Sequence, residues 1–220
     1  MAKVGVVLSG CGFQDGAEIH ESVLTLLALD RAGADVQIMA PDMNQFHVVN
    51  HLDGSEIETS RNILIESARI ARGNIVDVAT VSGSELDALI FPGGNGMAKN
   101  IFDYIMSGPE CEVIPDVYNL TAEMLIAGKP IGAICIAPVM MAKVLQNLGK
   151  TGQLTGGCNE GISADMVEMG VTAVQAGPGD IVVDEENKIV STPAYVEASS
   201  IKEAAEGIEK LVMKVLEMAG

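Results

Sequence analysis

Short apolar runs alternate with amphipathic stretches along the chain, and this alternation predicts strands that are followed by helices. The apolar runs predict strands at residues 3–9, 34–40, 87–91, 130–134 and 171–175. The amphipathic stretches predict helices at about residues 17–32, 61–72, 112–127, 138 onward, 160–169 and 197–218, with Ser60 as the cap of the second. Residues 180–192 are expected to form a hairpin that turns at Glu186 and Asn187. The pattern predicts one α/β domain over residues 1–220, a mostly parallel sheet with helices on both faces.

Composition narrows the class of protein. Hydrophobic residues make up 48% of the 220 residues while aromatic residues make up 3%, which predicts an aliphatic core that is rich in methionine. The chain has 13 basic and 30 acidic residues and a net charge of −17. This charge repels phosphate backbones and anionic lipids, so we expect neither a nucleic-acid partner nor a membrane partner.

Cysteine and histidine spacing gives no sign of a metal site. The cysteines Cys11, Cys111, Cys135 and Cys158 are widely separated and form no C-x-x-C pair, and the three histidines lie apart from them. The N-terminus reads MAKVGVVLSG and shows no pattern of a signal or transit peptide. We therefore expect reduced thiols, a cytoplasmic location and no bound metal.

The loop SGCGFQDGAEIHE, residues 9–21, follows the first predicted strand. Its glycines suggest a dinucleotide-binding turn, but Asp15 and Glu18 occupy the helix start that a pyrophosphate would need. One interpretation is a capped helix with no further role; the other is that Glu18 faces the ligand end of the sheet. Glu18 and His20 differ by about 200° around a helix, so we expect only one of them to face a pocket.

The segment FPGGNG, residues 91–96, ends a buried strand with adjacent glycines. A tight turn explains one glycine well and three less well. The alternative is an oxyanion site built from backbone N–H groups, with Gly94 as the leading donor.

The third loop contains GKPIGAICIAPVMMA, where Cys135 lies between a strand and a helix. A buried structural cysteine is one interpretation, since free cysteines are commonly buried. The small residues Ala133 and Ala137 on either side, together with Pro138, instead favour a sharp elbow that presents a nucleophile near a helix N-terminus.

These segments together resemble the ThiJ/PfpI superfamily, which is related to the class I glutamine amidotransferases. Within it, SGCGFQDGAEIHE, HLDG, SRNILIESARIARG, ELDALIFPGG, CIAP and GDIVVDEENKIVSTPAY look like the branch called ElbB, or isoprenoid biosynthesis protein with amidotransferase-like domain. The resemblance runs from about residue 3 to the final helix. It implies a flavodoxin-like three-layer sandwich that is usually a homodimer, and a glyoxalase or glycation-repair activity that needs no cofactor.

The resemblance also implies roles for individual residues. Cys135 would be the nucleophile, Glu18 the carboxylate in contact with it, and the N–H groups of Gly94 and Ile136 the oxyanion site. The histidine that amidotransferases place after the elbow is missing, because this chain has no histidine beyond His51. Asn159 or Glu160 lies roughly where that histidine would be and is a candidate substitute.

The leading hypothesis is a glutathione-independent glyoxalase that converts a small dicarbonyl, glyoxal or methylglyoxal, into a hydroxy acid through a Cys135 hemithioacetal. Glu18 would be the acid and base, and that role predicts a raised carboxyl pKa. Two alternatives stay open: a redox sensor or chaperone-like protein with an oxidisable Cys135, and an amidotransferase-like accessory protein of isoprenoid biosynthesis.

Overall fold

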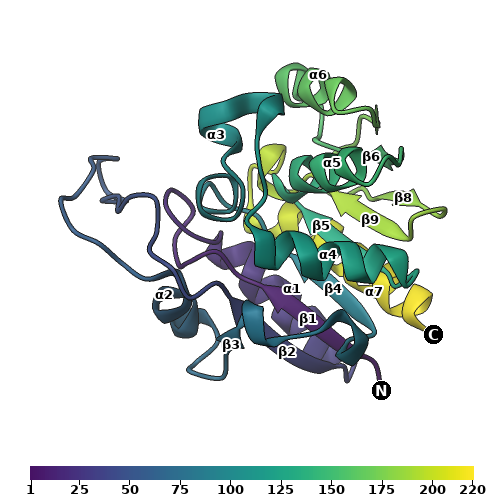
Figure 1. Cartoon of the computed structure of the whole chain (residues 1–220), viewed down its shortest axis with the longest axis horizontal. Helices are drawn as coiled ribbons and strands as arrows, with labels where there is room; N and C mark the ends of the chain where they lie inside the picture. Colours follow the sequence, from purple (N-terminus) through teal and green to yellow (C-terminus); the bar gives the residue numbers. More distant parts are fainter.

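The computed structural model describes all residues from 1 to 220, and a seven-stranded sheet forms its centre (Figure 1). The strand order is β3-β2-β1-β4-β5-β9-β8, and every pairing is parallel except that of β8 with β9. In chain order the strands are β1 (Lys3–Val7), β2 (Asp35–Ala40), β3 (Val76–Asp77), β4 (Ala88–Phe91), β5 (Ile131–Ile134), β8 (Val182–Asp184) and β9 (Ile189–Thr192).

The central strands are apolar on both faces because helices cover both sides of the sheet. Every residue of β4 (ALIF) and β5 (IGAI) is buried, as is usual for strands of a parallel sheet. In the register of these strands, Val4 lies beside Ala88 and Ile90 beside Gly132.

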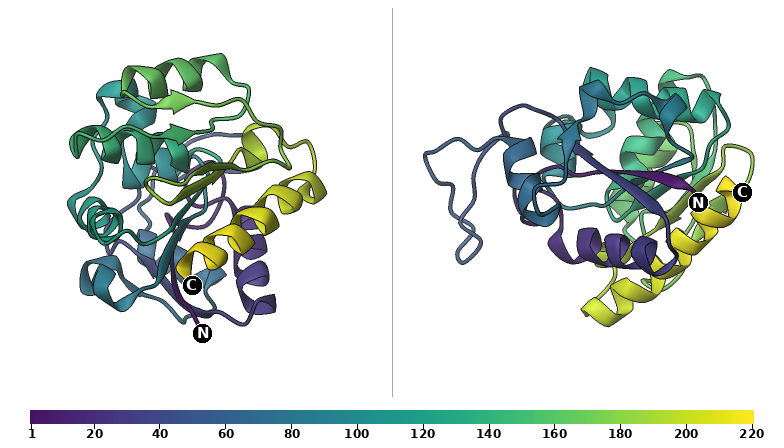
Figure 2. Two further views of the ribbon diagram at one scale, coloured as in Figure 1. Left: turned by 90° about the vertical axis from the view of Figure 1, so that its right-hand side faces the viewer. Right: turned by 90° about the horizontal axis from the view of Figure 1, so that it is seen from below.

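Helices α1 (Ile19–Arg31) and α7 (Ile201–Ala219) lie side by side on one face of the sheet (Figure 2). Helices α4 (Pro115–Ile126) and α5 (Ala137–Asn147) pack on the other face. Each face has its own buried cluster, and the three layers form the flavodoxin-like sandwich that the sequence predicts.

Smaller elements complete the fold. They are α2 (Ile63–Ile70), α3 (Tyr104–Ser107), α6 (Glu160–Glu168), the parallel pair β6 (Gln153–Leu154) and β7 (Thr172–Ala173), and a π-helical turn over Met97–Ile101. No helix has the length and apolar character needed to cross a lipid bilayer.

Most predicted elements are present, and the hairpin over β8 and β9 is confirmed. One predicted cap is wrong. Asn62 rather than Ser60 caps α2, because its Oδ1 accepts the N–H of Ile65 at 3.0 Å and the helix starts two residues later than expected. The two-residue strands β3 and β6 were not predicted, because they are too short to show a periodicity.

Between β2 and α2, residues 41–62 form a long arm that reaches away from the body of the molecule (Figures 1 and 2). Its base contacts the loop after β1, where Val49 donates its N–H to Asp15 Oδ2 at 2.8 Å. The arm thus lies beside the carboxyl ends of the parallel strands, where α/β sheets bind their ligands.

Candidate active site

Cys135 follows β5 directly and has a left-handed backbone conformation, with φ of 63°. Its N–H donates to Thr192 O at 2.9 Å, and α5 begins two residues later with Pro138 at its first turn. A non-glycine residue with positive φ between a strand and a helix is the geometry of a nucleophile elbow. Cys135 is partly exposed as a residue while its thiol is buried, and its backbone forms the elbow between strand and helix.

The partner of the thiol is Glu21, a fully buried residue in the first turn of α1. Its carboxylate accepts the N–H of Gly93 at 2.9 Å and that of Tyr195 at 3.2 Å, and it hydrogen-bonds with Cys135. Burial and the nearby charge of Glu18 raise the pKa of Glu21 to about 8, although the two backbone donors act in the opposite direction. A carboxyl group that is largely protonated at neutral pH therefore lies against the thiol.

The prediction that Glu18 contacts the thiol is wrong. Glu18 precedes α1 as its N-cap, with its Oε2 accepting the N–H of Glu21 at 2.7 Å. Its own N–H donates to Gly93 O at 2.9 Å. The helix begins at Ile19, so Glu18 lies outside the helical turn and position 21 is the one that faces inward. Glu18 holds the first turn in place, and Glu21 reaches the sulfur.

Glu21 was missed because the predicted cap, Asp15, lies three residues before the actual cap, Glu18. The D-x-x-E pattern predicts Asp15 as the cap, and the same spacing recurs between Glu18 and Glu21. In the structure Asp15 is buried under the arm as the acceptor for Val49, so only the second spacing marks the helix.

Gly94 and Ile136, whose N–H groups the family resemblance implies as the oxyanion site, both lie against Cys135. The N–H groups of both residues hydrogen-bond to the Cys135 sulfur and lower its pKa. Burial is the larger effect, and together with repulsion by Glu21 it raises the pKa of the Cys135 thiol well above its usual value. The chain has no room for side chains here, since a Cβ on Gly93 would lie 2.5 Å from the Cβ of Cys135.

Asn159 and Glu160, the candidate substitutes for the missing histidine, are not brought to the thiol. Asn159 Oδ1 accepts the N–H of Ile162 at 3.0 Å and caps α6, and Glu160 is an exposed residue at the start of that helix. The groups that hydrogen-bond to the sulfur come instead from α1, from the turn after β4 and from the elbow itself.

Beside this centre is a cavity of about 360 Å³ that is lined by Phe13, Glu18, His20 and Tyr195. His20 Nδ1 lies 2.8 Å from the Tyr195 hydroxyl oxygen. The expectation that Glu18 and His20 would diverge is therefore wrong. The 100° turn per residue applies within a helix, and Glu18 has an extended backbone before the helix begins.

The arm holds Phe13 in the wall of this cavity. The His51 ring packs edge-on against Phe13 with ring centroids 5.4 Å apart, and His51 Nε2 accepts the N–H of Gln14 at 3.3 Å. His51 Nε2 also lies 3.8 Å from the buried carboxylate of Asp15. His51 of the arm thus supports the Phe13 side chain in the cavity wall.

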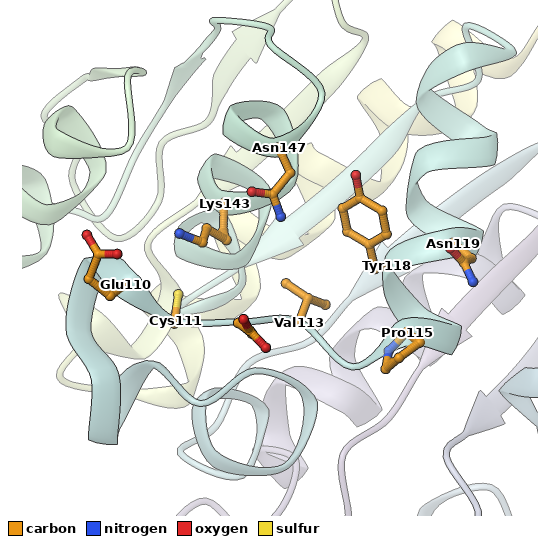
Figure 3. Close-up of a pocket in the computed structure, with 9 residues that line it drawn as sticks. Glu110, Cys111, Val113, Pro115, Tyr118, Asn119, Lys143 and Asn147 are labelled. Atoms are coloured by element: carbon orange, nitrogen blue, oxygen red, sulfur yellow. The ribbon is translucent and has the colours of Figure 1, made fainter.

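A second cavity, of about 410 Å³, lies on the α4–α5 face, with Lys143 and Asn147 on α5 and Tyr118 on α4 (Figure 3). Lys143 Nζ donates to Pro109 O at 3.1 Å and to Gln146 Oε1 at 2.9 Å. Cys111 is buried at its edge, and burial raises the pKa of that thiol to about 11. A thiol that stays protonated and lies among apolar side chains is a structural residue.

All four cysteines are free thiols, and no three side chains of His, Cys, Asp or Glu are grouped to hold a metal ion. The groups that meet at Cys135 are one thiol, one carboxyl group of raised pKa and a set of backbone donors.

Comparison with known proteins places this geometry in a family. Human glutamine amidotransferase-like class 1 domain-containing protein 3, a mitochondrial protein, is 44% identical over all of this chain and 84% of its own length. The zebrafish mitochondrial ES1 protein is 34% identical over 88% of this chain and 77% of its own. Because both relatives are named as mitochondrial, the expected cytoplasmic location stays a prediction.

Solved structures agree with the fold and with the sequence resemblance. An Ehrlichia chaffeensis isoprenoid biosynthesis protein with amidotransferase-like domain superposes with a TM-score of 0.93 at 34% identity, over the whole of both chains. Drosophila melanogaster DJ-1beta superposes with a TM-score of 0.55 at 21% identity, over 99% of this chain and 95% of its own, which shows the shared fold. The sequence profile of the DJ-1/PfpI family matches residues 8–200, and the chain belongs to that family.

Proposed function

We propose that this protein is a glutathione-independent glyoxalase that converts glyoxal and water into glycolate, and methylglyoxal into lactate. The observation that carries the proposal is the contact between the Cys135 thiol at its elbow and the buried carboxyl group of Glu21, whose pKa is about 8. A group with a pKa near the working pH can both take and give a proton, which the reaction requires in succession.

The first step forms a carbon–sulfur bond. Glu21 in its ionised form takes the thiol proton, and the sulfur of Cys135 adds to one carbonyl carbon of the substrate. The oxygen on that carbon gains the negative charge. The N–H groups of Gly94 and Ile136 lie beside the sulfur, so they can donate hydrogen bonds to this oxygen. Glu21 then returns the proton to this oxygen, giving a neutral hemithioacetal.

The second step moves hydrogen between the two carbons. Glu21 removes the proton from the carbon bonded to sulfur, and the electron pair passes to the second carbonyl to form an enediolate. Glu21 delivers the proton to the second carbon, and the hydroxyl proton moves from the first oxygen to the second. The product is a thioester of a hydroxy acid, which water hydrolyses to free the Cys135 thiol and the acid.

The charge of the site favours a neutral substrate. Glu18 and Glu21 are both acidic, and none of the four residues that line the cavity is lysine or arginine. A substrate carboxylate would meet repulsion there without a cationic partner. Glutamine hydrolysis by a Cys-His-Glu triad is also disfavoured, because no histidine follows the elbow in this sequence.

The two alternatives have weaker support. A redox sensor needs a thiolate at neutral pH, whereas burial raises the pKa of Cys135. A role in isoprenoid biosynthesis agrees with the name of the Ehrlichia protein, but no contact of Cys135 is specific for an isoprenoid.

The test is glycolate production from glyoxal by the purified protein in buffer free of thiols and amines. Cys135→Ser and Glu21→Gln are expected to abolish multiple turnovers, whereas Cys111→Ser, which removes a buried thiol on the other face, is the matched control and should keep full activity. Glyoxal consumption without multiple turnovers, or turnover that survives both site variants, would refute the proposal.

A further inference from the structure

Tyr195 contacts Glu21 through its backbone and lines the neighbouring cavity with its side chain. Its N–H donates to Glu21 Oε1 at 3.2 Å, and its side chain lines the cavity beside Glu18. The residue before it, Ala194, is buried and has a φ of 42°. Such strain in a non-glycine residue persists only where the surrounding structure enforces it, and it is typical of functional sites.

His20 fixes the position of the Tyr195 hydroxyl. Its Nδ1 lies 2.8 Å from the hydroxyl oxygen, and the two rings are tilted by 45° with centroids 5.8 Å apart. The tautomer of His20 that carries its proton on Nδ1 donates to this oxygen and leaves the Tyr195 O–H free for another acceptor. In the other tautomer, Nδ1 has no proton and accepts the hydrogen bond of the Tyr195 O–H. With His20 in the first tautomer, the cavity has one neutral side-chain donor besides the backbone.

We infer that the Tyr195 hydroxyl donates a hydrogen bond to the second carbonyl oxygen of a neutral dicarbonyl substrate, and that His20 is the positioning residue that orients this hydroxyl. The inference rests on the proposed function for the identity of the reacting atoms. The first carbonyl oxygen has the N–H groups of Gly94 and Ile136 as donors, so the second oxygen is the one that lacks a partner.

The hydroxyl acts without transferring its own proton. When Glu21 removes the hydrogen from the first carbon, the electron pair of that bond becomes the double bond of the enediolate, and the charge moves to the second oxygen. The hydrogen bond from Tyr195 strengthens as the charge grows, so it stabilises the transition state more than the hemithioacetal. Burial and the nearby carboxylates Glu18 and Glu21 raise the pKa of Tyr195, so its proton stays in place at neutral pH.

This role predicts selectivity for dicarbonyls over simple aldehydes. A simple aldehyde forms the same hemithioacetal with Cys135 but has no second oxygen for Tyr195. Methylglyoxal and propanal are therefore a matched pair of probes, since both are small and neutral and only the first has the second carbonyl.

The experiment measures protection of Cys135 from iodoacetamide as a function of aldehyde concentration, beside turnover of methylglyoxal. In Tyr195→Phe we expect the apparent dissociation constant for methylglyoxal to rise about 3- to 10-fold, as for one net hydrogen bond, with no change for propanal. Turnover should fall further, about 100-fold in kcat, as for the loss of one oxyanion donor. Tyr118→Phe, on α4 in the other cavity, should change neither quantity.

His20 variants separate positioning from packing. The amide of His20→Asn can occupy the place of Nδ1 and should retain most of the kcat, while His20→Phe should resemble Tyr195→Phe. Equal weakening of both aldehydes by Tyr195→Phe, or no weakening of either, would overturn the inference. The protection measurement needs no turnover, so a wild-type protein that forms the adduct but releases no lactate would refute the glyoxalase proposal and still test Tyr195.

Discussion

Glu21 and Cys135 hydrogen-bond with each other across the top of the sheet, one from the first turn of α1 and the other from the elbow after β5. Burial disfavours the charged form of each group, and the Glu21 carboxylate also repels the thiolate of Cys135. The two groups therefore titrate as a pair, and the form with a single proton between them contains both the nucleophile and the acid that the reaction needs.

The activity should rise with pH. Below the pKa of Glu21, at about 8, both groups hold their protons and the thiol has no base. We expect kcat/KM for glyoxal to increase about tenfold per pH unit between pH 6 and 7.5 and to level off above about pH 8. The measurement is a pH–rate profile in amine-free buffers; a profile that is flat from pH 5 to 8 would contradict the assignment.

Stability should change with pH in the opposite direction. The pKa of Glu21 is raised on folding from 4.5 to about 8, so between these values the folded state binds more protons than the unfolded state. The contribution of this group to the free energy of unfolding is then fully present below about pH 4.5 and decreases as the pH rises towards 8.

The neutral variant Glu21→Gln removes this dependence. We expect it to be more stable than the wild type at pH 8.5 by roughly 1–3 kcal/mol, with a smaller difference or none at pH 5.5. Urea unfolding at the two pH values measures the change. An equal difference at both values would indicate that packing rather than ionisation is responsible.

Gly93 should tolerate no side chain. A Cβ there would lie 2.5 Å from the Cβ of Cys135 and 2.9 Å from Glu21 Oε2, so Gly93→Ala must push the two reacting groups apart. We expect loss of most activity together with about 2–4 kcal/mol of stability. The control is Gly128→Ala, where φ is 65° and no atom lies within 4 Å, so it should cost about 1 kcal/mol and leave kcat unchanged.

The expected homodimer can be tested at α1. Ile19, Val23 and Leu27 recur every four residues and are 41%, 48% and 40% exposed, so they form an apolar stripe on the outer side of the helix. We expect light scattering to give the mass of two chains for the wild type and of one chain for Val23→Glu. Ile126→Glu, at an exposed apolar position at the end of α4, is the control and should remain dimeric.

The sequence predicts the layers of this fold well because a parallel sheet buried on both faces leaves strong signals, such as the apolar runs ALIF and IGAI. An elbow and a glycine turn have characteristic residues at fixed positions, so the sequence also predicts an elbow at Cys135 and a backbone donor at Gly94, whereas the role of Ile136 follows only from the family resemblance. It could not select Glu21 over Glu18. The two lie only three residues apart, and the start of the helix decides which carboxylate faces inward. That start depends on the hydrogen bond from Glu18 N–H to Gly93 O, which joins distant parts of the chain.

The position of Tyr195 in the site could not be predicted from any local sequence pattern. Its place beside His20 depends on the end of β9 lying next to the first helix, and these segments are far apart in the sequence. The pairing of β5 with β9 and the packing of α1 against α7 bring them together.

The parallel order of β1, β4, β5 and β9 also has a consequence for biosynthesis. Each neighbouring pair joins distant parts of the chain, and such contacts form only after long loops have closed. Glu21 has its backbone donors on the turn after β4 and on the segment after β9, so the carboxyl group cannot acquire its buried environment until Tyr195 has left the ribosome. A growing chain that stops short of β9 lacks both the Thr192 acceptor of the Cys135 N–H and the Tyr195 donor to Glu21, so the site forms only after the segment that follows β9 has been synthesised.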